Sequence, residues 1–145
     1  MESRPTVAGL QICPGTRQPM KPLDAVRAVE NMGLEGDRHA KPDSHRQVLL
    51  IEAETLEKLG LRVGQVKENI TTRGIALMSL PAGTRLHIGE AVLEVTAECR
   101  PCERMEELRP GLREILSGQR GVLARVAQGG TLRVGDPITV ETSTP

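Results

Sequence analysis

The sequence predicts a mainly β domain with short helices, of the α+β class, whose strands form a barrel. Two observations carry this prediction. Short apolar runs rich in β-branched residues recur along the chain, and turns that contain glycine or proline separate them. Only two segments show helical spacing instead. Many short strands with few helices are typical of a β-barrel that carries helical insertions.

The predicted strands follow one another along the whole chain. Their lengths and their content of valine and isoleucine favour strands over helices, and the turns CPG, PAG, IGE, QGG and VGD lie between them. In chain order they are VAGLQI (7–12), AVRAVE (25–30), QVLLI (47–51), RLHI (85–88), AVLEVTAE (91–98), GVLARV (121–126) and PITV (137–140).

The two predicted helical segments interrupt this pattern. In EAETLEKLG, Leu56 and Leu59 are three residues apart, and Gly60 is a suitable left-handed stop. In CERMEELRPGLREILSG, Pro110 is expected to split the segment into two short helices. The apolar stripe of this second segment comprises Met105, Leu108, Leu112, Ile115 and Leu116.

Length and composition restrict the function classes. A chain of 145 residues is expected to form one domain, spanning 1–145. Nineteen basic residues balance nineteen acidic ones, so we expect neither nucleic acid nor a membrane as partner. No secretory signal or membrane-spanning run is evident, and three cysteines are too few for a disulfide scaffold, which together predict a cytoplasmic protein. Without any aromatic residue, a flat ligand would be held by hydrogen bonds, charge and aliphatic contact.

The stretch TAECRPCERMEEL carries the first candidate site. Alternation along the preceding strand predicts that Cys99 ends a core-facing row and is a packed thiol. Pro101 suits the first turn of a helix, which would place Cys102 where free backbone N–H groups stabilise an anion. Arg100 and Arg104 add positive charge nearby. Cys102 is therefore the better candidate for a reactive thiolate.

Other interpretations of this stretch stay open at the level of sequence. An inert cysteine in a turn is common. A zinc site would need partners from Cys13, His39, His45 and His87, none of which has finger-like spacing. A thioredoxin-like role would need a CxxC motif within a βαβ unit, which the predicted elements do not provide.

Two further polar stretches hold candidate ligand-binding residues. In GLEGDRHA, Asp37, Arg38 and His39 arrive together, and they combine an orienting acceptor, a planar donor for phosphate or carboxylate, and a titratable donor. In KENITTRG, Asn69 and Arg73 are suited to contact a ligand. A solvated loop with an internal Asp–Arg pair would also explain the first stretch, and residues that cap and solvate a turn would also explain the second.

Taken together, these segments resemble the MOSC domain, the family named for the C-terminal region of molybdenum cofactor sulfurases. The resemblance rests on GLEGDRHA, QVLLIEAETL, KENITTRGI, LPAGTRLHIGEAVLEVTAECRPCERM and GVLARVAQGGTLRVGDPITV, in the order the family shows. Its most specific elements are the Gly-Asp-Arg-His turn, the Glu-Asn pair and the Pro-Cys that follows the long strand.

The resemblance implies a MOSC-type β-barrel in which Cys102 is the functional thiol. This thiol would either bear sulfur as a persulfide or bind molybdenum in its pterin cofactor (molybdopterin). The matching positions imply a cofactor site around Cys102 formed by Gly36, Asp37, Arg38, His39, Glu68 and Asn69. We hypothesise that these residues contact the cofactor's phosphate or pterin edge. Arg73, which was singled out above in KENITTRG, is added to this set of cofactor-binding candidates.

The chain also departs from multidomain members of the family. It has no room for the pyridoxal-phosphate domain of full sulfurases, so no PLP is expected here, and it lacks a four-cysteine set for an iron–sulfur cluster. Redox turnover would need a separate reductase, and sulfur loading would need a separate cysteine desulfurase. Cys99 is outside the matched pattern, which leaves a role as resolving thiol open.

Three functions remain after this comparison. The chain is either the molybdenum component of a system that reduces N-hydroxylated compounds, or a sulfurtransferase-like carrier with a persulfide on Cys102. Both functions need an accessible thiolate. A third possibility is a domain that binds a small anion through Arg38, His39 and Arg73 without thiol chemistry.

Overall fold

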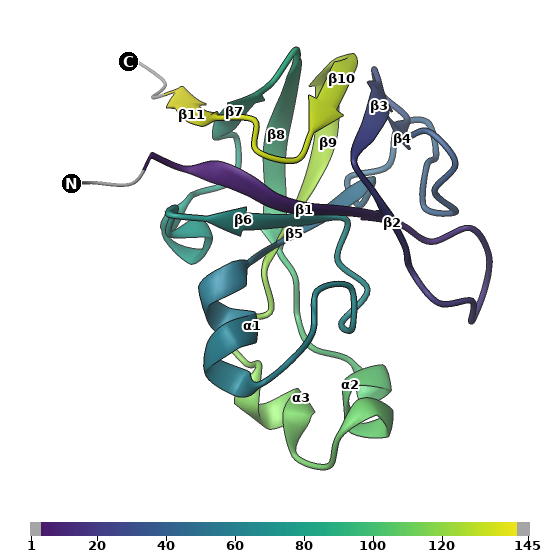
Figure 1. The fold of residues 1–145 in the computed structure, drawn as a ribbon, viewed down its shortest axis with the longest axis vertical. Coiled ribbons are helices and arrows are strands. Elements are labelled where there is room, and N and C mark those ends of the chain that lie inside the picture. Colours follow the sequence, from purple (N-terminus) through teal and green to yellow (C-terminus); the bar gives the residue numbers. More distant parts are fainter. Residues whose placement is uncertain (1–3, 142–145) are drawn as a thin grey trace.

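A computed structural model describes residues 4–141 of the chain. Strands dominate it, and three short helices gather at one end of the molecule (Figure 1). In chain order the elements are β1 (Thr6–Ile12), β2 (Lys21–Leu23), β3 (Ala25–Val29), β4 (Gly33–Leu34), β5 (Val48–Glu52), α1 (Ala53–Leu59), β6 (Ile70–Arg73), η1 (Leu77–Ser79), β7 (Arg85–Ile88), β8 (Ala91–Glu98), α2 (Glu103–Leu108), α3 (Leu112–Ile115), β9 (Val122–Gln128), β10 (Gly130–Arg133) and β11 (Ile138–Glu141).

The strands form two sheets, and the expected closed barrel is wrong. The larger sheet has eight strands in the order β11-β7-β8-β9-β5-β6-β1-β2, and the smaller has the order β10-β3-β4. The start of β1 lies beside the chain ahead of β11, where an isolated bridge between Thr6 and Pro137 and three backbone hydrogen bonds join the two segments, but they form no continuous ladder. Pro5 lies opposite Ile138 and accepts its N–H but has no N–H to donate in return, so the pairing does not continue as a regular ladder.

Most predicted elements are confirmed with small shifts of their ends. The strands β7 and β8 have the bounds expected from the sequence. Helix α1 ends at Gly60, whose φ of 68° is the left-handed stop expected there. Helices α2 and α3 are separate, as Pro110 between them predicts. The strands β2, β4, β6 and β10 were not predicted.

The helical segment differs from its prediction in two details. Helix α2 begins at Glu103, so Pro101 precedes the helix and Cys102 is its N-cap residue. In the expected apolar stripe, Met105, Leu112 and Leu116 are fully buried. Ile115 is 44% exposed, because a new helix begins after Pro110 and the two short helices do not share one continuous face.

Two aliphatic clusters stabilise the fold. The larger lies between the strands and contains Leu10, Leu50 and Leu93 among its fully buried members. The smaller is formed by the three helices and their neighbours, and consists of Ile51, Leu56, Leu61, Val66, Met105, Leu112 and Leu116. Since the chain has no aromatic residue, branched aliphatic side chains and methionine fill both clusters.

Within residues 4–141, no helix combines the length and apolar character needed to cross a lipid bilayer.

Candidate functional site

Cys102 lies on the segment that links the long strand β8 to helix α2. Its backbone is extended, with φ of −115° and ψ of 176°, and its carbonyl accepts the N–H of Met105 at 3.0 Å. The thiol makes no capping hydrogen bond, and the residue is exposed. The other two cysteines, Cys13 and Cys99, are buried. Cys102 is therefore the one accessible thiol among the described residues.

Two cavities meet at Cys102. The larger cavity, of about 370 Å³, is lined by Cys13, Thr16, Arg17, Gln18, Arg38, His39, Lys67, Cys102 and Arg104. The smaller cavity, of about 160 Å³, is lined by His39, Arg46, Leu49, Lys67, Asn69, Cys99, Arg100, Cys102, Arg120 and Leu123. His39, Lys67 and Cys102 belong to both walls. A group attached to the Cys102 sulfur would therefore have a cavity on each side.

Both walls are rich in cations. Among residues 4–141, seven arginine and lysine side chains line the two cavities and no aspartate or glutamate does. The whole chain has equal numbers of acidic and basic residues, so this excess is local. A concave surface of one charge sign concentrates ligands of the opposite sign. The site is therefore suited to an anionic ligand.

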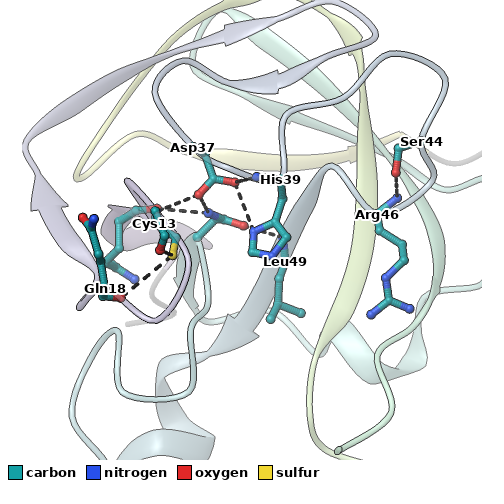
Figure 2. Close-up of polar contacts among 10 residues, drawn as sticks. Cys13, Gln18, Asp37, His39, Ser44, Arg46 and Leu49 are labelled. Atoms are coloured by element: carbon teal, nitrogen blue, oxygen red, sulfur yellow. Dashed lines mark hydrogen bonds and ion pairs between the residues drawn. The ribbon is translucent and has the colours of Figure 1, made fainter. Parts of the chain in front are cut away.

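Asp37 organises the turn that delivers Arg38 and His39 to the larger cavity. Figure 2 shows its carboxylate between Cys13 and His39. Oδ1 accepts the Cys13 N–H at 2.7 Å, and Oδ2 accepts the His39 N–H at 3.2 Å and lies 3.5 Å from His39 Nδ1. Burial alone would raise the pKa of Asp37, but the contacts from His39 and Cys13 outweigh it and hold that pKa below its ordinary value. Asp37 is therefore a buried anion that positions the ligand-facing residues.

Gly36 makes this turn possible without lining either cavity. Its φ of 88° lies in the left-handed region, and a Cβ there would come within 3.1 Å of the Ile12 side chain. The Asp37 N–H donates to the Leu34 carbonyl at 3.1 Å across the same turn. Gly36 thus contributes through the backbone alone.

Asn69 joins the two polar stretches and lines the smaller cavity. Its Nδ2 donates to Asp37 Oδ1 and to the Gln11 carbonyl, both at 3.2 Å, and its Oδ1 accepts the Leu49 N–H at 3.0 Å. The amide is fully used by strands β1 and β5 and by the Asp37 turn. Asn69 therefore fixes the geometry between the two cavities.

Glu68 is fully buried behind the site and forms part of neither wall. Its Oε2 accepts the Gly64 N–H at 2.7 Å and the Thr71 hydroxyl at 2.9 Å, while Oε1 has no partner among the described residues. Burial raises the pKa of Glu68, although these donors and the charge of Arg120 oppose the rise. Its position supports a structural role.

Arg73 lies away from both cavities. It is an exposed residue at the end of β6, and its Nη2 is paired with Glu57 of helix α1. The structure therefore brings Cys102, Arg38, His39 and Asn69 together, but it leaves Arg73 outside this group.

The sequence interpretation missed several cationic residues of the walls. Lys67 has a φ of 66°, a conformation that favours glycine, and its Nζ donates to the Gln18 carbonyl at 3.1 Å. Arg17, Arg46 and Arg120 were also missed. For Arg120 the available signal was a charged residue two positions before the apolar strand that begins at residue 122.

A family model described as MOSC domain matches residues 35–139. The matched range includes Asp37, Asn69 and Cys102 and every residue that lines the smaller cavity. The chain belongs to the MOSC domain family. This family is associated in general with the molybdenum cofactor.

Solved structures support the MOSC fold for this chain. The YuaD protein from Bacillus subtilis is 21% identical, with 98% of each chain covered and a TM-score of 0.83. YiiM from Geobacillus stearothermophilus is 19% identical, with 95% of this chain and 75% of that chain covered and a TM-score of 0.76. YiiM from Escherichia coli is 18% identical, with 96% and 71% covered and a TM-score of 0.72. No curated protein matches the sequence.

The residues of this MOSC domain fit an anionic cofactor that brings most of its own metal ligands. No group of three or more His, Cys, Asp or Glu side chains that could hold a bare metal ion occurs within residues 4–141. Cys102 offers one soft sulfur donor, and the cations around it can neutralise a phosphate. A volume of about 370 Å³ is also within the usual range, about 300 to 1,000 Å³, for organic ligands.

Proposed function

We propose that this MOSC protein binds the molybdenum pterin cofactor in the larger cavity, with the Cys102 thiolate as the protein ligand of the metal. The observation that carries the proposal is the position of Cys102, an exposed thiol in a wall that has cations and no carboxylate among the described residues. Bound molybdenum would supply two-electron redox chemistry. The chain would then serve as the terminal component of a system that reduces N-hydroxylated compounds, with a separate reductase.

The roles of the other wall residues follow from their chemistry. Arg38 presents a planar guanidinium suited to a phosphate, and Lys67 adds a point charge at the boundary of the two cavities. His39 is oriented by Asp37 through its backbone N–H and its Nδ1, which leaves Nε2 for a ligand or a proton. These side chains would bind and orient the cofactor.

Native mass spectrometry with elemental analysis tests this proposal on protein purified from its own host. Wild-type protein should carry molybdenum and a pterin-sized mass, and Cys102→Ser should lose the metal. Cys99→Ser is the matched control, because Cys99 is buried three residues earlier and should leave the metal in place. Metal retained in Cys102→Ser would refute the ligand assignment.

A second pair of variants tests the phosphate contact. Arg38→Ala should weaken retention of the cofactor without unfolding the protein, because Arg38 lines the larger cavity. Arg73→Ala should leave retention unchanged, because Arg73 is paired with Glu57 away from both cavities. Equal losses in the two variants would contradict the proposed contact.

The second candidate function is a sulfur carrier, and the position of Cys99 in the same small cavity as Cys102 favours it. The Cys102 thiolate would attack the outer sulfur of a persulfide on a cysteine desulfurase, displacing that enzyme's thiolate. A recipient nucleophile would then take the terminal sulfur and release the Cys102 thiolate. In the same mass spectra, a reducible sulfur adduct on Cys102 without molybdenum would support this function over the first.

A further inference from the structure

The smaller cavity has a property that the proposed cofactor does not explain. Its volume, about 160 Å³, is below the range of about 300 to 1,000 Å³ typical for organic ligands of cofactor size. It would hold about five water molecules at about 30 Å³ each. A small ion or a small polar group fits this space, whereas a pterin does not.

The wall of this cavity contains a buried arginine whose donors are largely unused. Arg120 is 5% exposed, and its Nη2 donates to the Val66 carbonyl at 2.6 Å. Its Nε and Nη1 have no hydrogen-bond partner in the part of the chain that the structure describes. Buried polar groups are nearly always paired, so two unpaired donors on one guanidinium indicate that a partner is missing.

No carboxylate among the described residues neutralises this guanidinium by direct contact. The charge of Glu68 acts on Arg120, but the two form no ion pair within 4.0 Å. Leaving one charge buried and unpaired is strongly unfavourable, whereas an anion beside it would supply both charge and acceptors.

The other charged residues of the wall also favour an anion in this cavity. Arg46, Arg100 and Lys67 line the cavity together with Arg120. The backbone holds Arg120 in this place. A Cβ on the next residue, Gly121, would lie 2.2 Å from the Leu50 carbonyl oxygen, and the Gly121 carbonyl accepts the Cys99 N–H at 2.9 Å. The start of β9 is thus fixed against β5 on one side and Cys99 on the other.

We propose that the smaller cavity is a binding site for a small oxyanion, held by Arg120 beside Cys99 and Cys102 and separate from the larger cavity. The oxyanion is either a free tetrahedral ion or the carboxylate of a small organic molecule. It would neutralise Arg120 and lie against the thiol wall. The proposal does not depend on bound molybdenum, so its failure would leave the cofactor assignment unaffected.

Thermal unfolding followed by far-ultraviolet circular dichroism tests the site, with sulfate exchanged for chloride at constant ionic strength. At ten times its Kd, sulfate should raise the Tm of the wild type by about 4 °C beyond its general salting effect. Arg120→Met should respond to sulfate only by that general effect. Arg73→Met is the control, because Arg73 is paired with Glu57 and lines neither cavity, and it should keep the full response.

Selenate in crystals of the wild-type protein provides a test that does not depend on the folding of any variant. An anomalous peak within hydrogen-bond distance of Arg120 would support the site. Acetate then separates the two sources: a response to sulfate alone identifies a free tetrahedral ion, and a response to acetate identifies a carboxylate. A full sulfate response in Arg120→Met, a peak confined to the larger cavity, or no response in the wild type would overturn the proposal.

Discussion

Replacing Asp37 by alanine should destabilise the protein by about 3 kcal/mol at neutral pH. The carboxylate accepts from the Cys13 N–H at 2.7 Å and from Asn69 Nδ2 at 3.2 Å, and both donors are buried. Each hydrogen bond to a charged group is worth about 1.5 to 3 kcal/mol. Removing the carboxylate also removes the cost of burying a charge, which offsets part of the loss. We therefore take the lower end of the range for two such hydrogen bonds.

Urea unfolding measures this loss. For a slope of about 1.5 kcal/mol per molar urea, the unfolding midpoint of Asp37→Ala should fall by about 2 M. Asp24→Ala is the matched control, because Asp24 is exposed and its side chain meets no donor in the described part of the chain; its midpoint should stay within the error. A loss below about 1 kcal/mol at Asp37 would refute the role of this carboxylate as the organiser of the turn.

The pH dependence gives a second check on the same residue. The folded pKa of Asp37 is held below its ordinary value, so its contribution to stability is complete above the unfolded pKa of about 3.9 and is lost as pH falls through the folded pKa. The stability difference between wild type and Asp37→Ala should therefore shrink on acidification below about pH 4. A difference that is the same at pH 7 and pH 3.5 would contradict the assignment of the charge.

Three further predictions concern other parts of the molecule. Iodoacetamide should label Cys102 in the folded, cofactor-free protein and spare the buried Cys13 and Cys99. Mass spectrometry of the intact chain should then show a single adduct, and rapid labelling at Cys99 would contradict its burial. The folded pKa of Glu68 is raised, so its contribution to stability is present below the unfolded pKa of about 4.3 and is lost as pH rises through the folded pKa. In Glu68→Gln the urea midpoint should therefore decline less with rising pH than in the wild type. Parallel pH profiles of the two proteins would contradict the raised pKa. Leu93→Ala should lower the free energy of unfolding by about 3 kcal/mol, because Leu93 is fully buried in the larger cluster, and a loss under about 1 kcal/mol in urea unfolding would be inconsistent with that packing.

Local patterns in the sequence predicted the elements whose own residues decide their structure. Strands β7 and β8 alternate and are joined by a glycine turn, and Gly60 ends α1 in a conformation that glycine favours. Strand β6 was missed because ITTR has no alternation, although tertiary contacts bury its first three residues. Strand β2 was missed because KPL contains a proline, which a strand at the edge of a sheet tolerates.

The candidate site was predictable only in part, because some of its residues come together only through tertiary contacts. Cys102 and His39 were identified from their neighbours in the chain, and Asn69 from its position directly after Glu68. The sequence could not show that Asp37 is buried behind the wall, since this depends on its contacts with Cys13, directly after β1, and with Asn69. Nor could it bring Arg120 to Cys102, because the sheet pairing of β8 with β9 places them together.

The aliphatic character of the core has an optical consequence. Without phenylalanine, tyrosine or tryptophan in its sequence, the polypeptide contributes almost no absorbance in the near ultraviolet. A conjugated heterocycle bound beside Cys102 would therefore dominate that region of the spectrum. Its release or a change in its oxidation state could be followed directly in the intact protein, with no protein chromophore to subtract.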